Sequence, residues 1–163
     1  MELGTIIAGA VLIALCAIPL TYMYLNVKRR EKKMLNLINT MAEKDGCHIT
    51  ISNVSGDFVI GMDETANVLY VVSRMKDHER RNQVNLNEVK ACQLNRVDRV
   101  VKNQEGQTTM IEKLELLLTT KDATTEAVEF YHMDLSSQLY DELTLIQKWY
   151  QIVCSRIAKV EHA

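Results

Sequence analysis

The chain begins with a long stretch of apolar positions. Residues 3–27 contain no Asp, Glu, Lys, Arg or His. A helix of that length rises to about 37 Å, whereas the hydrocarbon core of a bilayer is about 30 Å thick. We therefore predict a transmembrane anchor over residues 1–27 that contacts the lipid bilayer through residues 3–27. Pro19 lies inside this stretch, and membrane-spanning helices tolerate proline.

A helical pattern continues past the apolar stretch. The next apolar positions recur at intervals of three and four on one helix face: Met34, Leu37, Ile38 and Met41. A glycine at position 46 favours a stop. This predicts a basic stalk helix over residues 28–46, which we expect to pack on the following domain rather than pair with a second copy.

After Gly46 the period changes from helical to alternating. The predicted strands cover residues 47–52, 58–62, 68–74, 83–89, 91–101, 108–120 and 127–133. The charged residues 75–82 predict a loop. From Leu135 onward the apolar positions again step by three and four, which predicts an amphipathic helix that carries Trp149. The order of the strands predicts an antiparallel meander.

Seven strands followed by one amphipathic helix with a tryptophan resemble a pleckstrin-homology-like domain over about residues 47–158. The resemblance implies two sheets forming a seven-strand antiparallel barrel that the C-terminal helix caps, and Trp149 matches the tryptophan that many members carry there. We therefore expect an α+β chain with a pleckstrin-homology-like domain over residues 47–163. The rival is another α+β sheet with helices packed on one face.

The same resemblance raises the question of lipid-phosphate binding. Family members that bind phosphoinositides need clustered cations in the loop between the first two strands, because several cations must surround a polyanionic headgroup. The corresponding loop here reads NVSGD and has no cation. We therefore do not expect phosphoinositide binding by that route.

The charges divide the chain into a basic junction and a mildly acidic body. Residues 28–44 hold six Lys and Arg against two Glu, while residues 45–163 hold thirteen Lys and Arg against eighteen Asp and Glu. The basic cluster directly follows the apolar stretch: Lys28, Arg29, Arg30, Lys32 and Lys33. Cations beside a span are retained in the cytoplasm, so we expect a short N-terminus outside and a cytoplasmic C-terminal domain. A cleavable signal would carry its charges before the apolar stretch, and the acidic body argues against nucleic-acid binding.

The chain shows no motif typical of catalysis or cofactor binding. The four cysteines are far apart and are expected to be free thiols, and the histidines lack a partner at metal-ligand spacing. Nucleophile-elbow and phosphate-binding motifs are absent from the sequence. We predict no enzyme activity, no cofactor and no metal site. A second basic group in the charged loop is a candidate surface contact for anionic lipid or an acidic partner: Arg74, Lys76, Arg80 and Arg81.

Together these patterns predict a single-pass, membrane-anchored, non-catalytic protein that presents a cytoplasmic domain for protein–protein interaction. Two alternatives stay open. One is a structural subunit of a larger membrane-associated complex that oligomerises through the span and stalk, since small residues recur along the span at helix-face spacing. The other is peripheral contact with anionic lipid through the basic stalk.

Overall fold

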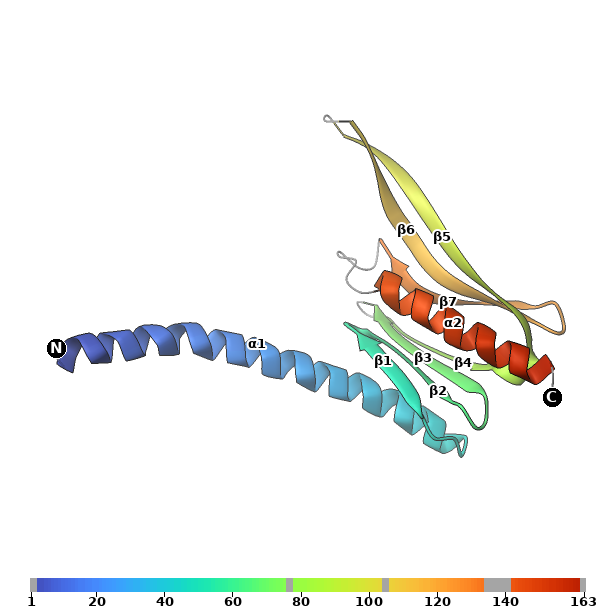
Figure 1. The fold of residues 1–163 in the computed structure, drawn as a ribbon, viewed down its shortest axis with the longest axis horizontal. Helices are drawn as coiled ribbons and strands as arrows, with labels where there is room; N and C mark the ends of the chain where they lie inside the picture. Colours follow the sequence, from blue (N-terminus) through green and yellow to red (C-terminus); the bar gives the residue numbers. More distant parts are fainter. Residues whose placement is uncertain (1–2, 76–77, 104–105, 134–141, 162–163) are drawn as a thin grey trace.

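A computed structural model describes residues 3–75, 78–103, 106–133 and 142–161. The chain forms a long N-terminal helix, two antiparallel sheets and a C-terminal helix (Figure 1). The elements are α1 Leu3–Lys44, β1 Ile51–Ser55, β2 Phe58–Asp63, β3 Val68–Met75, β4 His78–Asn85, the 3-10 turn η1 Leu86–Glu88, β5 Val89–Asn103, β6 Gly106–Thr120, β7 Thr125–His132 and α2 Glu142–Glu161. The predicted α+β class and antiparallel meander are confirmed.

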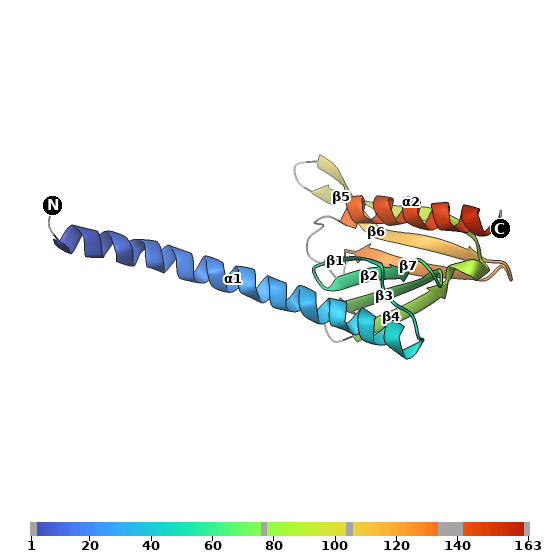
Figure 2. The ribbon, with the colours of Figure 1, turned by 60° about the horizontal axis from the view of Figure 1, so that its bottom comes forward.

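The strands divide into a first sheet of order β1-β2-β3-β4 and a second sheet of order β5-β6-β7. Within the described ranges no strand pairing joins the two sheets, so the predicted closed barrel is not observed. The helix α2 packs mainly on β5, with further contacts to β6, β7 and η1. The two helices lie on opposite sides of the strands (Figure 2).

The main core lies between the two sheets and α2. Its members include Phe58, Ile60, Met62, Leu69, Val71, Leu114, Leu116, Leu118, Val128, Ile146, Trp149 and Val153. Trp149 is fully buried there, as its place on the apolar stripe of the helix predicts. The side chains of α2 also reach the turn between β2 and β3 of the first sheet through the ion pair between Arg156 and Glu64. This helix therefore links the two sheets that backbone pairing leaves separate.

A second core attaches α1 to the outer face of the first sheet. It consists of Met34, Ile38, Ala42, Val59, Tyr70 and Val72. Strand β2 is consequently buried at all six of its residues, because one face meets the main core and the other meets α1. Gly61 allows the close approach: a Cβ built there would lie 2.6 Å from Cδ1 of Ile38. The prediction that the stalk packs on the domain is confirmed, and anchor and stalk form one continuous helix.

The first strand starts later than the alternation predicted. It begins at Ile51, because the residues before it are held by the buried carboxylate of Asp63, which accepts the backbone N–H of His48 at 2.7 Å. The same carboxylate accepts the N–H groups of Thr65 and Ala66 in the next turn. These bonds lower the pKa of Asp63 below its ordinary value, with the bond from Ala66 contributing most.

The prediction of a loop over residues 75–82 is wrong. They include the last residue of β3 and the first five residues of β4, with Met75 paired to His78, while residues 76–77 lie outside the described residues. Glu79, Arg80 and Arg81 belong to the edge strand β4, where exposed charged side chains discourage pairing with other chains. The strand predicted over residues 83–89 also ends earlier than expected, at Asn85, because the Asn85 side chain accepts the N–H of Asn87 and caps the 3-10 turn η1.

Candidate functional site

The N-terminal part of α1 exposes an unbroken apolar surface. Its large apolar side chains between Val11 and Val27 are 48–72% exposed, and α1 is long and apolar enough to cross a membrane. Contiguous apolar surface of this extent is unusual on a protein that is surrounded by water. The structure thus contains a candidate membrane span, and the side on which the domain lies stays a prediction.

The predicted basic cluster lies on α1 between this surface and the contact with the first sheet. Its side chains occupy consecutive helical positions and therefore point around the helix rather than to one side. Lys28 pairs with Glu31 at 3.4 Å and lies 5.9 Å above the ring centre of Tyr24. Arg30 instead faces the groove described below.

The second predicted basic group is largely paired within the β3–β4 hairpin. Arg74 contacts Glu79 at 2.9 Å and Arg81 contacts the same carboxylate at 2.5 Å. Hydrogen bonds from Arg74 and then Arg81 hold the pKa of Glu79 below its usual range. Arg80 is exposed, and Lys76 lies outside the described residues. This group therefore presents less free positive charge than its sequence predicts.

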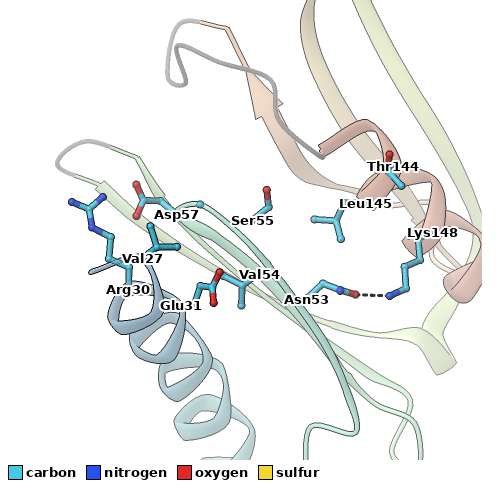
Figure 3. Close-up of a pocket in the computed structure, with 11 residues that line it drawn as sticks. Val27, Arg30, Glu31, Asn53, Val54, Ser55, Asp57, Thr144, Leu145 and Lys148 are labelled. Carbon is cyan, nitrogen blue, oxygen red and sulfur yellow. Dashed lines mark hydrogen bonds between the residues drawn. The ribbon is translucent and has the colours of Figure 1, made fainter. Parts of the chain in front are cut away.

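A groove of about 980 Å³ lies where α1, the β1–β2 turn and the start of α2 meet (Figure 3). Its lining residues are Val27, Arg30 and Glu31 from α1, Asn53, Val54, Ser55, Gly56 and Asp57 around the turn, and Thr144, Leu145 and Lys148 from α2. The groove follows β1, the edge strand of the first sheet. It begins at Val27, the last residue of the apolar stretch, so it lies directly beside the base of the candidate span.

Side chains, rather than backbone pairing, connect β1 to α2 across the groove. Nζ of Lys148 donates to Oδ1 of Asn53 at 3.0 Å, and Oγ of Ser55 donates to Oε1 of Glu142 at 3.4 Å. In the described part of the chain, β1 makes no strand pairing other than that with β2. Its outer edge therefore offers backbone N–H and C=O groups to a further strand.

The groove combines both signs of charge with a small apolar surface. Arg30 and Asp57 lie toward one end, and Lys148 lies toward the other (Figure 3). Val27, Val54 and Leu145 supply apolar contacts between them. A lining of this kind, along a free strand edge, suits an extended polypeptide that carries polar and charged side chains.

The strongly perturbed groups lie outside the groove and are packed in the fold. Burial, and then the neighbouring Cys154, raise the pKa of the Cys92 thiol to about 12, which leaves it protonated and unreactive at neutral pH. Burial raises the pKa of Tyr70, whose hydroxyl donates to Asp45 at 3.0 Å. Within the described ranges, no group of three or more His, Cys, Asp or Glu is placed to hold a metal ion.

The sequence analysis identified a candidate site residue on only one wall of the groove. The basic cluster pointed to Arg30, but the other walls come from segments around residues 53 and 145 that are far apart in the chain. The turn NVSGD has no cation and therefore gave no signal of a charged site. A signal was present in the helix at residues 144–148, since a polar face beside an apolar stripe indicates an exposed surface.

No family model matches the chain, and neither the curated proteins nor the solved structures contain a significant match to it.

Proposed function

We propose that this protein is a single-pass, membrane-anchored, non-catalytic interaction module. Its domain, of pleckstrin-homology-like arrangement, binds an extended segment of another protein on the cytoplasmic side of the membrane. The observation that carries the proposal is the groove along the unpaired edge of β1, at the base of the candidate span.

The pleckstrin-homology-like arrangement is supported by the element order. Four strands, then three strands, then one helix with a buried tryptophan follow the order that the resemblance implies. The β1–β2 turn carries Asp57 and no cation, so the binding mode proposed here uses the strand edge rather than a phosphate-binding loop.

The binding mode is strand addition. A segment of about five residues, some 17 Å long, would match the length of β1. Its backbone would pair with the outer edge of β1, and its side chains would point alternately toward α1 and toward α2. Arg30 and Lys148 would meet acidic side chains of the partner, while Glu31 and Asp57 would meet basic ones.

The tether contributes to affinity without adding a contact. A partner in the same membrane is held near the groove, so its effective concentration is high even when the intrinsic affinity is modest. The partner class that fits best is therefore a membrane protein with an extended segment close to its own span.

A second candidate function is direct contact with anionic lipid through the basic stalk. It is favoured by the exposure of Lys28, Arg29, Lys32 and Lys33 at the end of the apolar stretch. Each cation near an anionic surface contributes roughly 1 kcal/mol of attraction. Oligomerisation through the span, as in a structural subunit, stays a prediction.

Site-specific photocrosslinking of the full chain in its native membrane tests the proposal. A photoreactive amino acid at Asn53 lies in the groove, and one at Gln83 on β4 lies at the opposite edge of the same sheet. We expect a discrete protein adduct from position 53 only. Filling the groove by Thr144→Trp, at an exposed position, should abolish that adduct. Equal adducts from both positions, or an adduct that survives the filled groove, would contradict the proposal.

A further inference from the structure

The groove between α1, the β1–β2 turn and α2 has one end beside the candidate span. Val27, the last residue of the apolar stretch, lines this end, and Arg30 follows it by less than one turn of α1. Asp57 of the β1–β2 turn lies at the same end as Arg30 (Figure 3). We call Val27, Arg30 and Asp57 the mouth of the groove. If α1 spans a bilayer, the mouth is the part of the groove nearest to it.

The length of the apolar stretch places the mouth at the level of the lipid headgroups. Residues 3–27 form about 37 Å of helix and the hydrocarbon core is about 30 Å thick, so a centred span extends about 4 Å into each headgroup layer. Val27 then lies among the headgroups. Arg30 lies about 4.5 Å further along the axis, and its side chain leans back toward the bilayer, because the side chains of a helix tilt toward its N-terminus.

The mouth presents one cation and one carboxylate that lack a partner. The whole lining holds two charges of each sign, from Arg30, Lys148, Glu31 and Asp57, so its net charge is zero. Glu31 already pairs with a lysine of α1 at 3.4 Å, and Lys148 donates to an asparagine of β1 at 3.0 Å. Within the described ranges, the exposed side chains of Arg30 and Asp57 form no ion pair or hydrogen bond. The mouth therefore suits a ligand that carries a negative and a positive group close together.

We propose that the headgroup of a phosphatidylethanolamine from the anchoring bilayer occupies the mouth whenever no protein segment fills the groove. Its phosphate accepts hydrogen bonds from the guanidinium of Arg30, and its ammonium donates to the carboxylate of Asp57. Val27 contacts the apolar part of the lipid next to the headgroup. This inference rests on the proposed membrane anchoring, and it adds to the proposed function the ligand that a partner has to displace.

The chemistry of the lining favours ethanolamine over other headgroups. A primary ammonium has three N–H donors for a carboxylate, whereas the trimethylammonium of choline has none and is typically bound by aromatic faces. The described lining residues include no aromatic side chain. A glycerol headgroup would leave Asp57 without a cation, and a serine headgroup would bring a further carboxylate close to Asp57 and Glu31.

A headgroup in the mouth makes binding of the partner dependent on lipid. A segment that adds to the edge of β1 brings its own side chains to Arg30 and Asp57, so the two ligands compete for the same pair of charges. The partner then binds more weakly in a bilayer rich in phosphatidylethanolamine than in one of phosphatidylcholine. Lipid composition would thus regulate the groove without a change in the fold.

Native mass spectrometry of the detergent-solubilised full chain tests this inference. The chain is mixed with equal amounts of phosphatidylethanolamine and phosphatidylcholine that carry the same acyl chains. We expect the ethanolamine lipid to be retained roughly tenfold more than the choline lipid, since one hydrogen bond to a charged group contributes about that factor. Arg30→Gln and Asp57→Asn should each remove the preference. The matched controls Arg29→Gln and Asp122→Asn change the same charges at exposed positions outside the groove and should keep it.

Hydrogen exchange of the full chain in nanodiscs provides a second measurement, in a bilayer. Amides of the β1–β2 turn, residues 55–57, should exchange more slowly in phosphatidylethanolamine than in phosphatidylcholine, and Asp57→Asn should remove this difference. The β6–β7 turn, residues 121–124, lies at the end of the domain away from α1 and should exchange equally in both lipids (Figure 1).

Three results would overturn the inference. The first is equal retention of the two lipids, or a preference that survives both Arg30→Gln and Asp57→Asn. The second is stronger retention of phosphatidylglycerol than of phosphatidylethanolamine, since the stalk cations would then hold the lipid. The third is a dimer that Asp57→Asn dissociates, since a second copy would then occupy the mouth.

The same preparations separate this inference from the proposed function. If the unsubstituted chain fails to float with vesicles, membrane anchoring is wrong and both proposals fall. If it floats and gives the adduct from position 53 but shows no preference for ethanolamine, the interaction module stands and only the lipid site is overturned. If it shows the preference but gives no adduct, the lipid site stands without the protein partner.

Discussion

The contact between Gly61 and Ile38 provides a quantitative test of how α1 joins the domain. A Cβ at position 61 would lie 2.6 Å from Cδ1 of Ile38, 3.0 Å from Cγ2 of Ile49 and 3.3 Å from the backbone oxygen of Ile51. The first distance is too short for an unshifted structure. Gly61→Ala should therefore push α1 away from the first sheet or force Ile38 into another rotamer.

The expected cost follows from two opposing effects. Overpacking a buried site typically costs about 1–3 kcal/mol. Replacing glycine by alanine in a conformation open to both returns about 0.4–1 kcal/mol by restricting the unfolded chain. The net destabilisation of Gly61→Ala should be about 1–2 kcal/mol. Ile38→Val removes the clashing Cδ1 and alone should cost about 0.5–1.5 kcal/mol, as other methylene deletions do.

The double variant distinguishes a specific clash from general damage. Once Cδ1 of Ile38 is absent, the methyl group at position 61 occupies the space it leaves, so the two costs should not add. We expect the pair to be about 1 kcal/mol more stable than the sum of the single variants, within the range known for residues in contact. The contacts of the new methyl with Ile49 and Ile51 retain part of the cost.

Urea unfolding of the full chain in detergent micelles measures these values. Trp149 is the single tryptophan and is fully buried in the main core, so its emission reports unfolding of the domain. Strand β2 belongs to both cores, and loss of the α1 contact should therefore reach this reporter. Additivity of the single variants to within about 0.5 kcal/mol would refute the close approach as the source of the cost. A stabilising Gly61→Ala would refute it more directly.

Two further predictions concern the main core and the carboxylate of Asp63. Trp149→Ala should destabilise the domain by about 3–5 kcal/mol, because it removes a fully buried side chain from the main core. Trp149→Phe should cost clearly less, because the indole N–H has no hydrogen-bond partner in the described structure and none is lost. The unfolding temperatures of the two variants, measured by circular dichroism, test this order. The pKa of Asp63 is lowered on folding from an ordinary value near 3.8, so its stabilisation is complete above that value and is lost as the pH falls through the lower folded value. Asp63→Asn should therefore lower stability at pH 7 and flatten the decline below pH 4, and unchanged acid unfolding in this variant would contradict the assignment.

The sequence predicted the elements that carry a strong hydrophobic period. The apolar stretch, the stalk face around Ile38 and the stripe that contains Trp149 each repeat over several turns, and the structure places all three as helices. The first part of β4 was assigned to a loop, because charged residues on an edge strand resemble a loop when pairing is unknown. The start of β1 was misplaced because the bonds from the Asp63 carboxylate to His48 and Ala66 have no signature in local composition.

The candidate site was less predictable than the fold. A groove depends on which segments meet, and no periodicity relates Arg30, Asn53 and Lys148. Strands β5 and β6 were both predicted, but the extension of their hairpin beyond β7 follows only from the register of the pairing. The ion pairs of Glu79 with Arg74 and Arg81 likewise follow only from the pairing of β3 with β4, which brings these side chains together.

Helix α1 is both the candidate span and part of the second core, and this restricts what the groove can bind. The same helix carries the apolar surface up to Val27 and enters the second core at Met34, seven residues later. Seven helical residues span about 10 Å, so no flexible linker separates the candidate span from the domain. If the candidate span crosses a bilayer, the groove that begins at Val27 is therefore held within a short distance of the headgroups. A partner segment that ends far from the membrane would have to bend back to reach it, whereas a segment that leaves the bilayer as a strand beside α1 meets the edge of β1 directly.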